Sequence, residues 1–198
     1  MKDRRDAILD VAISLAEEGG FDNVRQRDVA AHAGVALGTL YKRFRSKEDI
    51  LVAALDRETE ALERRMEARP APGGTPIERV SSFFQTVTRG MCKKPKYARA
   101  VLRAVASGEP EVATKVAAYQ DRMTGLIIAA LRGVGRLGFK DATSSPPSRT
   151  ERTLAFALQQ IWFASLVGWS AGILSQSQVV EQMRVTGEIL MRGVEGHP

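Results

Sequence analysis

The residues with the clearest chemical potential lie between positions 25 and 47, where six Lys and Arg side chains face one acidic residue, Asp28. Clustered cations of this kind pair with the phosphates of a polyanion, and the formal charge of +6 on the 198-residue chain favours the same class of partner. The sequence carries no nucleophile–base pair and no metal-ligand spacing, because Cys92 is the only cysteine and His32 and His197 stand far apart. We therefore expect a nucleic-acid-binding protein with no cofactor and no metal, and not an enzyme.

Helices must position these cations. Apolar residues recur at spacings of three and four, and no stretch alternates as a half-buried strand would. The pattern predicts an all-α fold of about nine helices, with an N-terminal three-helix helix-turn-helix domain that a fourth helix joins to a larger helical domain. The expected domains are residues 1–48 and 49–198, and a stretch rich in proline and glycine, residues 69–76, interrupts the second one. The expected helices cover about residues 4–18, 27–33, 36–44, 46–69, 76–93, 97–106, a segment that ends near 132, 148–174 and 175–193.

The basic stretch contains a short helix with two different faces. On a helical wheel Leu40 and Phe44 point together and can anchor the helix, whereas Tyr41 and Lys42 point the other way. Gly38 lowers helix stability by about 1 kcal/mol relative to alanine, which is reasonable where a backbone must approach another surface closely. A short helix, a glycine turn and this helix form a helix-turn-helix that fits a DNA major groove. The expected DNA contacts are Arg25, Gln26, Arg27, Leu37, Gly38, Thr39, Tyr41, Lys42 and Lys47.

The run RDVAAHAGVALGTLYKRFRSKED, residues 27–49, resembles the signature of TetR-type transcriptional regulators. The matching positions are Ala33, Gly34, Val35, Gly38, Thr39, Leu40, Tyr41, Phe44, Ser46, Lys47 and Glu48. The resemblance implies a homodimer, usually a repressor, that binds a palindromic double-stranded operator and is released by a small molecule. Two positions depart from the family pattern: Arg25 stands where a Ser or Thr usually caps the second helix, and Ala36 replaces a residue that is commonly polar.

The stretches RGMCKKPKYARAVLRA and IWFASLVGW are also similar to KstR-type regulators of sterol and lipid catabolism. The family plan implies a cavity for a hydrophobic or acyl-CoA-like effector in the middle region, although ordinary core packing explains the same apolar residues. The expected lining residues are Leu62, Met66, Phe83, Phe84, Val87, Met91, Leu102, Tyr119, Met123, Ile127, Trp162 and Phe163. A second cluster of cations is expected either at the cavity mouth, where it would attract an anionic ligand, or on a solvated surface: Arg89, Lys93, Lys94, Lys96, Arg99 and Arg103.

No charged residue occurs from Thr153 to Val180. Gln159 and Gln160 interrupt this run, so we expect a helix buried on both sides and no membrane partner. Small residues at intervals of four would let a second helix cross closely, and the last helix repeats the same periodicity. The expected dimer interface, with an intrachain core as the alternative, is Ala164, Gly168, Gly172, Val179, Met183, Thr186 and Leu190.

The N-terminal segment MKDRRDAILD lacks the apolar core of a secretory signal, and one cysteine cannot form an intramolecular disulfide. Both features favour a cytoplasmic protein. The alternative function that the residues leave open is a sequence-indifferent architectural DNA-binding protein without an effector.

Overall fold

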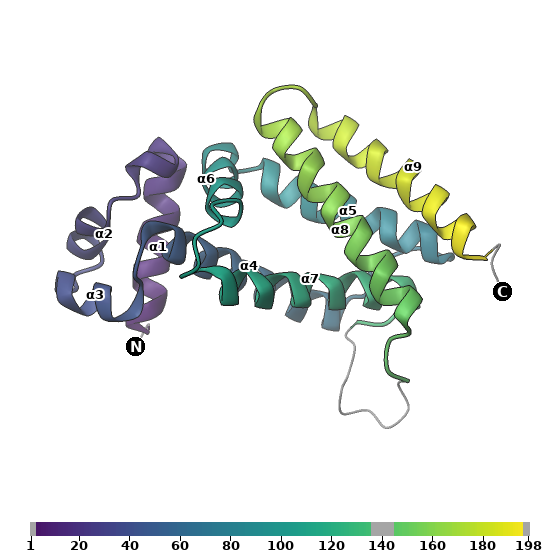
Figure 1. The fold of residues 1–198 in the computed structure, drawn as a ribbon, viewed down its shortest axis with the longest axis horizontal. Helices are drawn as coiled ribbons and strands as arrows, with labels where there is room; N and C mark the ends of the chain where they lie inside the picture. The colour runs from purple at the N-terminus through teal and green to yellow at the C-terminus, as the bar shows by residue number, and fades with distance from the viewer. Residues whose placement is uncertain (1–2, 136–144, 196–198) are drawn as a thin grey trace. The chain divides into compact units, whose positions relative to one another are not determined.

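The computed structural model describes residues 3–135 and 145–195, and within them the chain is all helical, with no strand (Figure 1). The prediction of an all-α fold is therefore confirmed. The helices are α1 Arg4–Gly19, η1 Phe21–Asn23 (a 3-10 turn), α2 Gln26–His32, α3 Leu37–Arg43, α4 Lys47–Ala68, α5 Pro76–Cys92, α6 Pro95–Val105, α7 Ala113–Arg132, α8 Arg149–Ser170 and α9 Gln176–Glu195.

Local sequence signals explain several of these ends. Asp3 caps α1, since its side chain accepts a hydrogen bond from the Arg5 backbone N–H at 3.2 Å. Ser148 and Glu151 form a reciprocal capping box at the start of α8, as their spacing predicts. Pro95 occupies the first turn of α6, where its missing N–H costs nothing, so this helix begins two residues before its expected start.

The end of α8 differs from the prediction. The helix ends at Ser170 and does not continue to residue 174. Ala171 is its C-cap, and Gly172, the next residue, has a φ of 77°. A glycine adopts this left-handed conformation without the steric cost that a side chain would carry. Gly172 therefore acts as a helix terminator and is not a small residue on a helix face.

The described helices form two compact units, and each unit combines two segments of the chain. The N-terminal unit comprises residues 1–59 and 93–119, and the second unit comprises 60–92 and 120–198. These units do not follow the expected boundary between 48 and 49, because α6 and the first turns of α7 pack with the N-terminal helices. The division into functional domains at that boundary stays a prediction.

The core of the N-terminal unit is formed where α1 meets α2, η1 and α6. Ile8 and Leu9 of α1 are fully buried, as are Ile50 and Leu51 in the first turn of α4. Arg57 on α4 fastens this helix to α1, donating hydrogen bonds to the Asp6 backbone carbonyl at 3.2 Å and to Asp10 Oδ1 at 2.7 Å.

In the second unit, α9 lies along both α5 and α8 (Figure 1). Aromatic rings fill the interior, where Phe83 and Phe84 meet edge to face with centroids 5.3 Å apart and Trp162 lies 6.0 Å from Phe84. The part of α8 that follows Arg152 carries no charged residue, and it buries Leu158 and Trp162 against these neighbours. Among the described residues, no helix is long and apolar enough to cross a membrane.

Candidate nucleic-acid interface

The turn between α2 and α3 is formed around a glycine. Gly34 has a φ of 64°, and the flanking chain is closed by a hydrogen bond of 3.0 Å from the Val35 N–H to the Ala30 carbonyl. Leu40 is fully buried and Phe44 nearly so, as the wheel predicts. One face of α3 is thereby fixed to the unit, and its other face is left at the surface.

The outward face of α3 carries the residues expected to read DNA. Tyr41 is 48% exposed although it is a large aromatic residue, and Gly38 and Lys42 are exposed beside it. Leu37 and Thr39 are half-buried. A Cβ built on Gly38 would meet no atom within 4 Å, so the chain's own packing does not require glycine there. The requirement is explained if another molecule approaches the backbone at this point.

The start of α2 has no side-chain cap, as the replacement by Arg25 predicts. Arg25 and Arg27 are both exposed, which leaves their guanidinium groups accessible to a phosphate. Gln26 is half-buried and donates a 3.3 Å hydrogen bond to the Phe44 carbonyl, so in the free protein it links α2 to the end of α3.

The first turn of α4 is held by a buried carboxylate. Asp49 accepts a hydrogen bond from the Arg45 N–H at 3.0 Å and also binds Lys115 of α7. Its own N–H donates to Ser46 Oγ at 3.1 Å, so Ser46 caps the start of α4. Lys47, in the same turn, lies 3.9 Å from the Phe21 ring centroid and 3.6 Å from Asp22 Oδ1.

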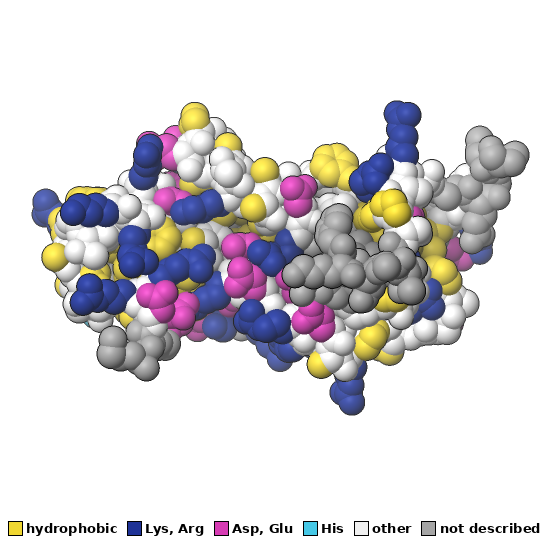
Figure 2. All heavy atoms as spheres, turned by 90° about the horizontal axis from the view of Figure 1, so that it is seen from below, with side chains coloured by type: hydrophobic (Ala, Val, Ile, Leu, Met, Phe, Trp, Pro, Cys, Tyr) yellow, Lys and Arg dark blue, Asp and Glu magenta, His cyan; other side chains and the backbone are white. Residues whose placement is uncertain are grey.

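Positive charge gathers on this unit. Figure 2 shows Lys and Arg side chains crowded over the surface of the N-terminal helices, with a few acidic groups between them. Arg25, Arg27 and Lys42 are among the exposed cations on α2, α3 and the turn before α2. A surface of this kind is the electrostatic pattern typical of nucleic-acid binding.

The second cluster of cations is divided between the two units. Lys94 pairs with Glu17 at 2.5 Å, and Lys96 donates to the Glu18 backbone carbonyl at 2.7 Å. Arg103 pairs with Asp22 at 3.4 Å. Three of the six cations therefore bind the end of α1 or η1 within the N-terminal unit. These contacts explain the three cations without an effector.

The expected effector-lining residues lie mostly in the interior. Met66, Phe83, Phe84, Val87, Leu102, Tyr119, Met123, Ile127 and Trp162 are buried, and Leu62, Met91 and Phe163 are half-buried. Leu102 and Tyr119 belong to the N-terminal unit and the others to the second one. Two polar contacts interrupt this apolar interior: Trp162 Nε1 donates to Thr88 Oγ1 at 2.9 Å, and Thr124 Oγ1 donates to Gln159 Oε1 at 3.1 Å. Sequence reasoning missed Thr88 and Thr124, since a threonine in a helix carries no signal of its own.

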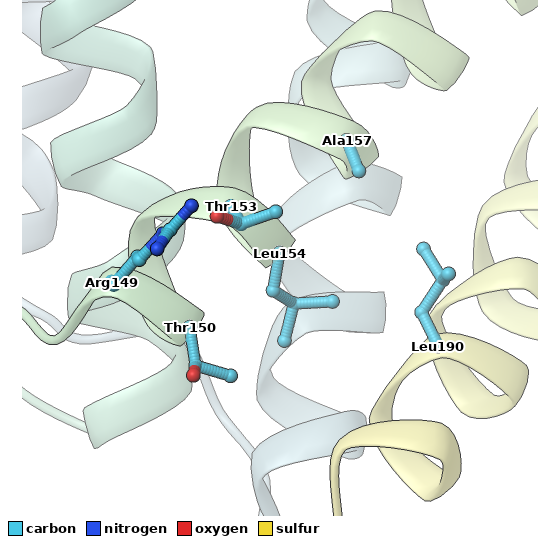
Figure 3. A pocket seen from close by; sticks show the side chains of 6 residues that line it. All are labelled: Arg149, Thr150, Thr153, Leu154, Ala157 and Leu190. Atoms are coloured by element: carbon cyan, nitrogen blue, oxygen red, sulfur yellow. The ribbon is translucent and has the colours of Figure 1, made fainter.

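A pocket of about 300 Å³ lies between the first turns of α8 and the last turns of α9. Figure 3 shows Leu190 of α9 facing Leu154 of α8 across it, with Arg149, Thr150, Thr153 and Ala157 completing the lining. None of the expected effector-lining residues takes part in this pocket. Leu190, which we expected at a dimer interface, does.

The expected dimer residues separate into different environments. Val179 and Met183 are fully buried inside the chain, where α9 packs on α5 and α8, so they form its own core and offer no surface to a second copy. A Cβ on Gly168 would lie 3.2 Å from the chain's own Leu174, so this close approach is also intrachain. Ala164 and Gly172 are exposed, and Thr186 and Leu190 are half-buried.

Another set of residues on α8 and α9 is apolar and exposed. Phe156 and Val167 lie three helical turns apart on one face of α8, and Val185 and Ile189 lie one turn apart on α9. Ile173, in the connection, is 75% exposed. We call these five residues the apolar surface. Sequence reasoning missed them because apolar residues cover more of each helix than the side that packs inside, and periodicity alone does not say which of them stay exposed.

The all-helical fold, the glycine-centred turn and the exposed basic face define a DNA-binding helix-turn-helix protein. Residues 8–54 match the family described as bacterial regulatory proteins, tetR family, and residues 73–190 match the one described as tetracyclin repressor-like, C-terminal domain. The chain belongs to the tetR family. It is therefore a DNA-binding transcriptional regulator and not an enzyme.

Curated and solved relatives agree with this assignment. The HTH-type transcriptional repressor KstR of Rhodococcus jostii (strain RHA1) is 32% identical over 190 residues, covering 96% of this chain and 84% of that protein. A TetR transcriptional regulator from Rhodococcus sp. RHA1 has the same fold, with a TM-score of 0.80, 24% identity and 96% coverage of both chains. Thermus thermophilus FadR, a TetR-family repressor solved in complex with lauroyl-CoA, has a TM-score of 0.74 and 18% identity, covering 96% of this chain and 94% of its own. The resemblance to KstR-type regulators is thus confirmed.

Proposed function

We propose that this regulator is a dimeric repressor that binds a palindromic operator and is released by a hydrophobic or acyl-CoA-like effector. One observation carries the DNA-binding part of the proposal. The face of α3 that presents Gly38, Tyr41 and Lys42 is exposed, although its opposite face is anchored by Leu40 and Phe44. A helix fixed in this way can enter a major groove without losing its place in the unit.

The contacts divide by chemistry. Lys42, Arg25 and Arg27 are suited to backbone phosphates, which give affinity but little sequence selectivity. Leu37 and Thr39 are suited to base edges, because a leucine side chain fits a thymine methyl and a hydroxyl can donate or accept. We infer that sequence preference depends on the first turn of α3 and that general affinity depends on the cations around it.

The apolar surface supports the dimer. A Phe that is 52% exposed and an Ile that is 65% exposed, Phe156 and Ile189, lie on adjacent helices that are already packed on each other. Large exposed apolar side chains in groups usually mark an interaction site. A second copy is the partner that fits, because two helices from each protomer would form a four-helix interface and a two-fold symmetric protein matches a palindromic DNA site.

The effector class rests on the interior of the second unit. Apolar side chains dominate there, and a few polar groups such as Thr88 and Gln159 are buried among them. Ligand sites for apolar molecules commonly combine these two features. Thermus thermophilus FadR binds lauroyl-CoA, and we extend the same class of ligand to this chain. An effector that binds better to the conformation with low DNA affinity releases the operator by linkage.

Selection of bound DNA from a random pool tests the proposal. A regulator should enrich an inverted repeat, and footprinting should protect both half-sites. Enrichment of no sequence would instead support the architectural alternative. Lauroyl-CoA, laurate and free CoA should then be titrated against the operator complex. Release by lauroyl-CoA alone supports an acyl-CoA effector. Release by laurate would show that the protein recognises the acyl group and not the CoA phosphates.

A further inference from the structure

Lys47 and Arg103 come from distant parts of the sequence, yet both cations lie against the same aromatic ring. Lys47 Nζ is 3.9 Å from the Phe21 ring centroid, and the Arg103 guanidinium carbon is 4.1 Å from it. The Phe21 ring is buried, but the two cationic side chains remain 30% and 61% exposed. The ring thus holds two positive groups close together at the surface of the N-terminal unit.

One carboxylate lies with both of these cations. Asp22 Oδ1 is 3.6 Å from Lys47 Nζ and 3.4 Å from Arg103 Nη1, and no other acidic residue in the described part of the chain pairs with either cation. The Asp22 side chain is 80% exposed. Two neighbouring cations with one oxyanion between them make an arrangement in which a phosphate can replace the carboxylate.

We propose that Arg103, on α6 and outside the helix-turn-helix, binds a DNA backbone phosphate together with Lys47, and that Asp22 occupies this two-cation site in the free protein. The proposal rests on the proposed function, since it names a DNA contact of the same unit. Lys47 is one residue after the N-cap of α4, and Arg103 reaches it because α6 packs on α1 and η1.

The exchange is physically favourable. Exposed ion pairs such as Asp22 with Arg103 contribute little to stability, so moving Asp22 aside costs little. A phosphate offers a guanidinium two parallel hydrogen bonds, and its binding releases counterions from DNA. Asp22 is therefore expected to lower DNA affinity by competing for both cations. If Asp22, Lys47 and Arg103 had only a structural role, loss of Asp22 would instead weaken DNA binding.

The test measures operator affinity at several salt concentrations for the full-length wild type and a set of variants. Arg103→Ala should weaken binding about 3- to 10-fold and reduce the slope of log affinity against log salt by about one. Arg103→Lys should retain the slope, and Asp22→Asn should tighten binding about 3-fold or more because both cations are released. Arg89→Ala, which removes another exposed cation from α5, should change affinity less than about 2-fold.

Thermal melting of each variant separates folding from binding, and Asp22→Asn provides a readout even if Arg103→Ala fails to fold. Weaker binding by Asp22→Asn, or a salt slope for folded Arg103→Ala equal to that of Arg89→Ala, would overturn the proposal. Lys42→Ala in the same series reports on the proposed function separately. If Lys42→Ala weakens binding and Arg103→Ala does not, the helix-turn-helix interface stands and the two-cation site is rejected; a wild type that binds no DNA overturns both.

Discussion

The indole Nε1–H of Trp162 donates a 2.9 Å hydrogen bond to Oγ1 of Thr88, and both side chains are buried in the second unit. This bond links α8 to α5 through the interior rather than at the surface. Phe84, in contact with the indole ring, surrounds it with apolar atoms. An N–H group in such a place needs its partner, because water does not replace a lost acceptor there.

Thr88→Val removes that acceptor at nearly constant volume. We expect the free energy of unfolding to fall by about 1–3 kcal/mol, which is the usual cost of a buried donor left without a partner. Urea denaturation followed by Trp fluorescence measures it. Thr86→Val on the exposed face of the same helix is the matched control, and an equal loss in both variants would contradict a role for the Trp162 bond.

Lys42→Ala should weaken binding to all DNA sequences alike. The side chain is exposed on the outward face of α3, so its loss removes a phosphate contact without disturbing the core. We expect the salt slope to fall by about one and the free energy of unfolding to stay within about 0.5 kcal/mol. Fluorescence anisotropy with operator and with unrelated DNA provides the measurement. A selective loss on the operator alone would place Lys42 on a base instead.

The helix-turn-helix could be predicted because its determinants are local. Gly34 permits the turn, and the spacing of Leu40 and Phe44 identifies the buried face within one helix. The environment of Lys47 could not be predicted, since Phe21, Asp22 and Arg103 approach it only after α1, η1 and α6 have packed. Sequence periodicity describes a helix face but does not say which distant residues meet it.

Ile189→Asp should favour the monomer. Ile189 is 65% exposed on α9, so a carboxylate is tolerated in a free protomer but not in an apolar interface. We expect sedimentation velocity to show a shift from dimer to monomer at micromolar concentration, and operator affinity to fall with it. Val134→Asp, at another exposed apolar residue of the same unit, should leave the dimer intact. A dimeric Ile189→Asp variant would argue against the apolar surface as the interface.

Met183→Ala should act differently, although it lies on the same helix. Met183 is fully buried in the protomer, so its truncation leaves a cavity and should lower the free energy of unfolding by about 2–5 kcal/mol. Urea denaturation measures this loss. Sedimentation of the folded fraction should still give a dimer. Dissociation of the dimer without loss of protomer stability would instead place Met183 at the dimer interface, as the periodicity of its helix predicted.

The difference between Met183 and Ile189 also shows where sequence reasoning fails. Both residues are large and apolar, and they lie six positions apart on one helix. Only the packing of α5 against α9 determines that the first faces inward and the second outward. The family resemblance implied a dimer, but it did not identify which apolar face would remain available.

The pair formed by Arg132 and Glu151 should make stability depend on acid. The Arg132 guanidinium, which donates to both carboxylate oxygens at 2.6 and 2.8 Å, lowers the pKa of Glu151 from 4.5 to about 2. A lowered folded-state pKa stabilises the protein above pH 4.5, and this contribution is lost as the pH falls from 4.5 towards 2.

Arg132→Met should therefore lower the free energy of unfolding by about 1–2 kcal/mol at neutral pH, and the deficit should shrink as the pH approaches 2. Denaturation at a series of pH values measures it. Arg184→Met removes the same charge from an exposed pair on α9 and should give a smaller loss. A deficit for Arg132→Met that does not vary with pH would show that the lost contacts are with the backbone carbonyls of Ser145 and Pro146, which Arg132 also binds.

The N-terminal unit is formed by two separate segments of the chain, and this limits how the protein can be re-engineered. Because α6 packs on α1 and η1, a fragment cut after residue 59 would carry the recognition helix but would leave the apolar residues of α1 without their cover. Joining only the first 59 residues to a domain of another protein would also remove Arg103 and Lys115. The ion pairs that these two cations form with Asp22 and Asp49 would then be lost. A working chimaera must keep residues 93–119 with the N-terminal helices, so the second unit cannot be exchanged at a single cut.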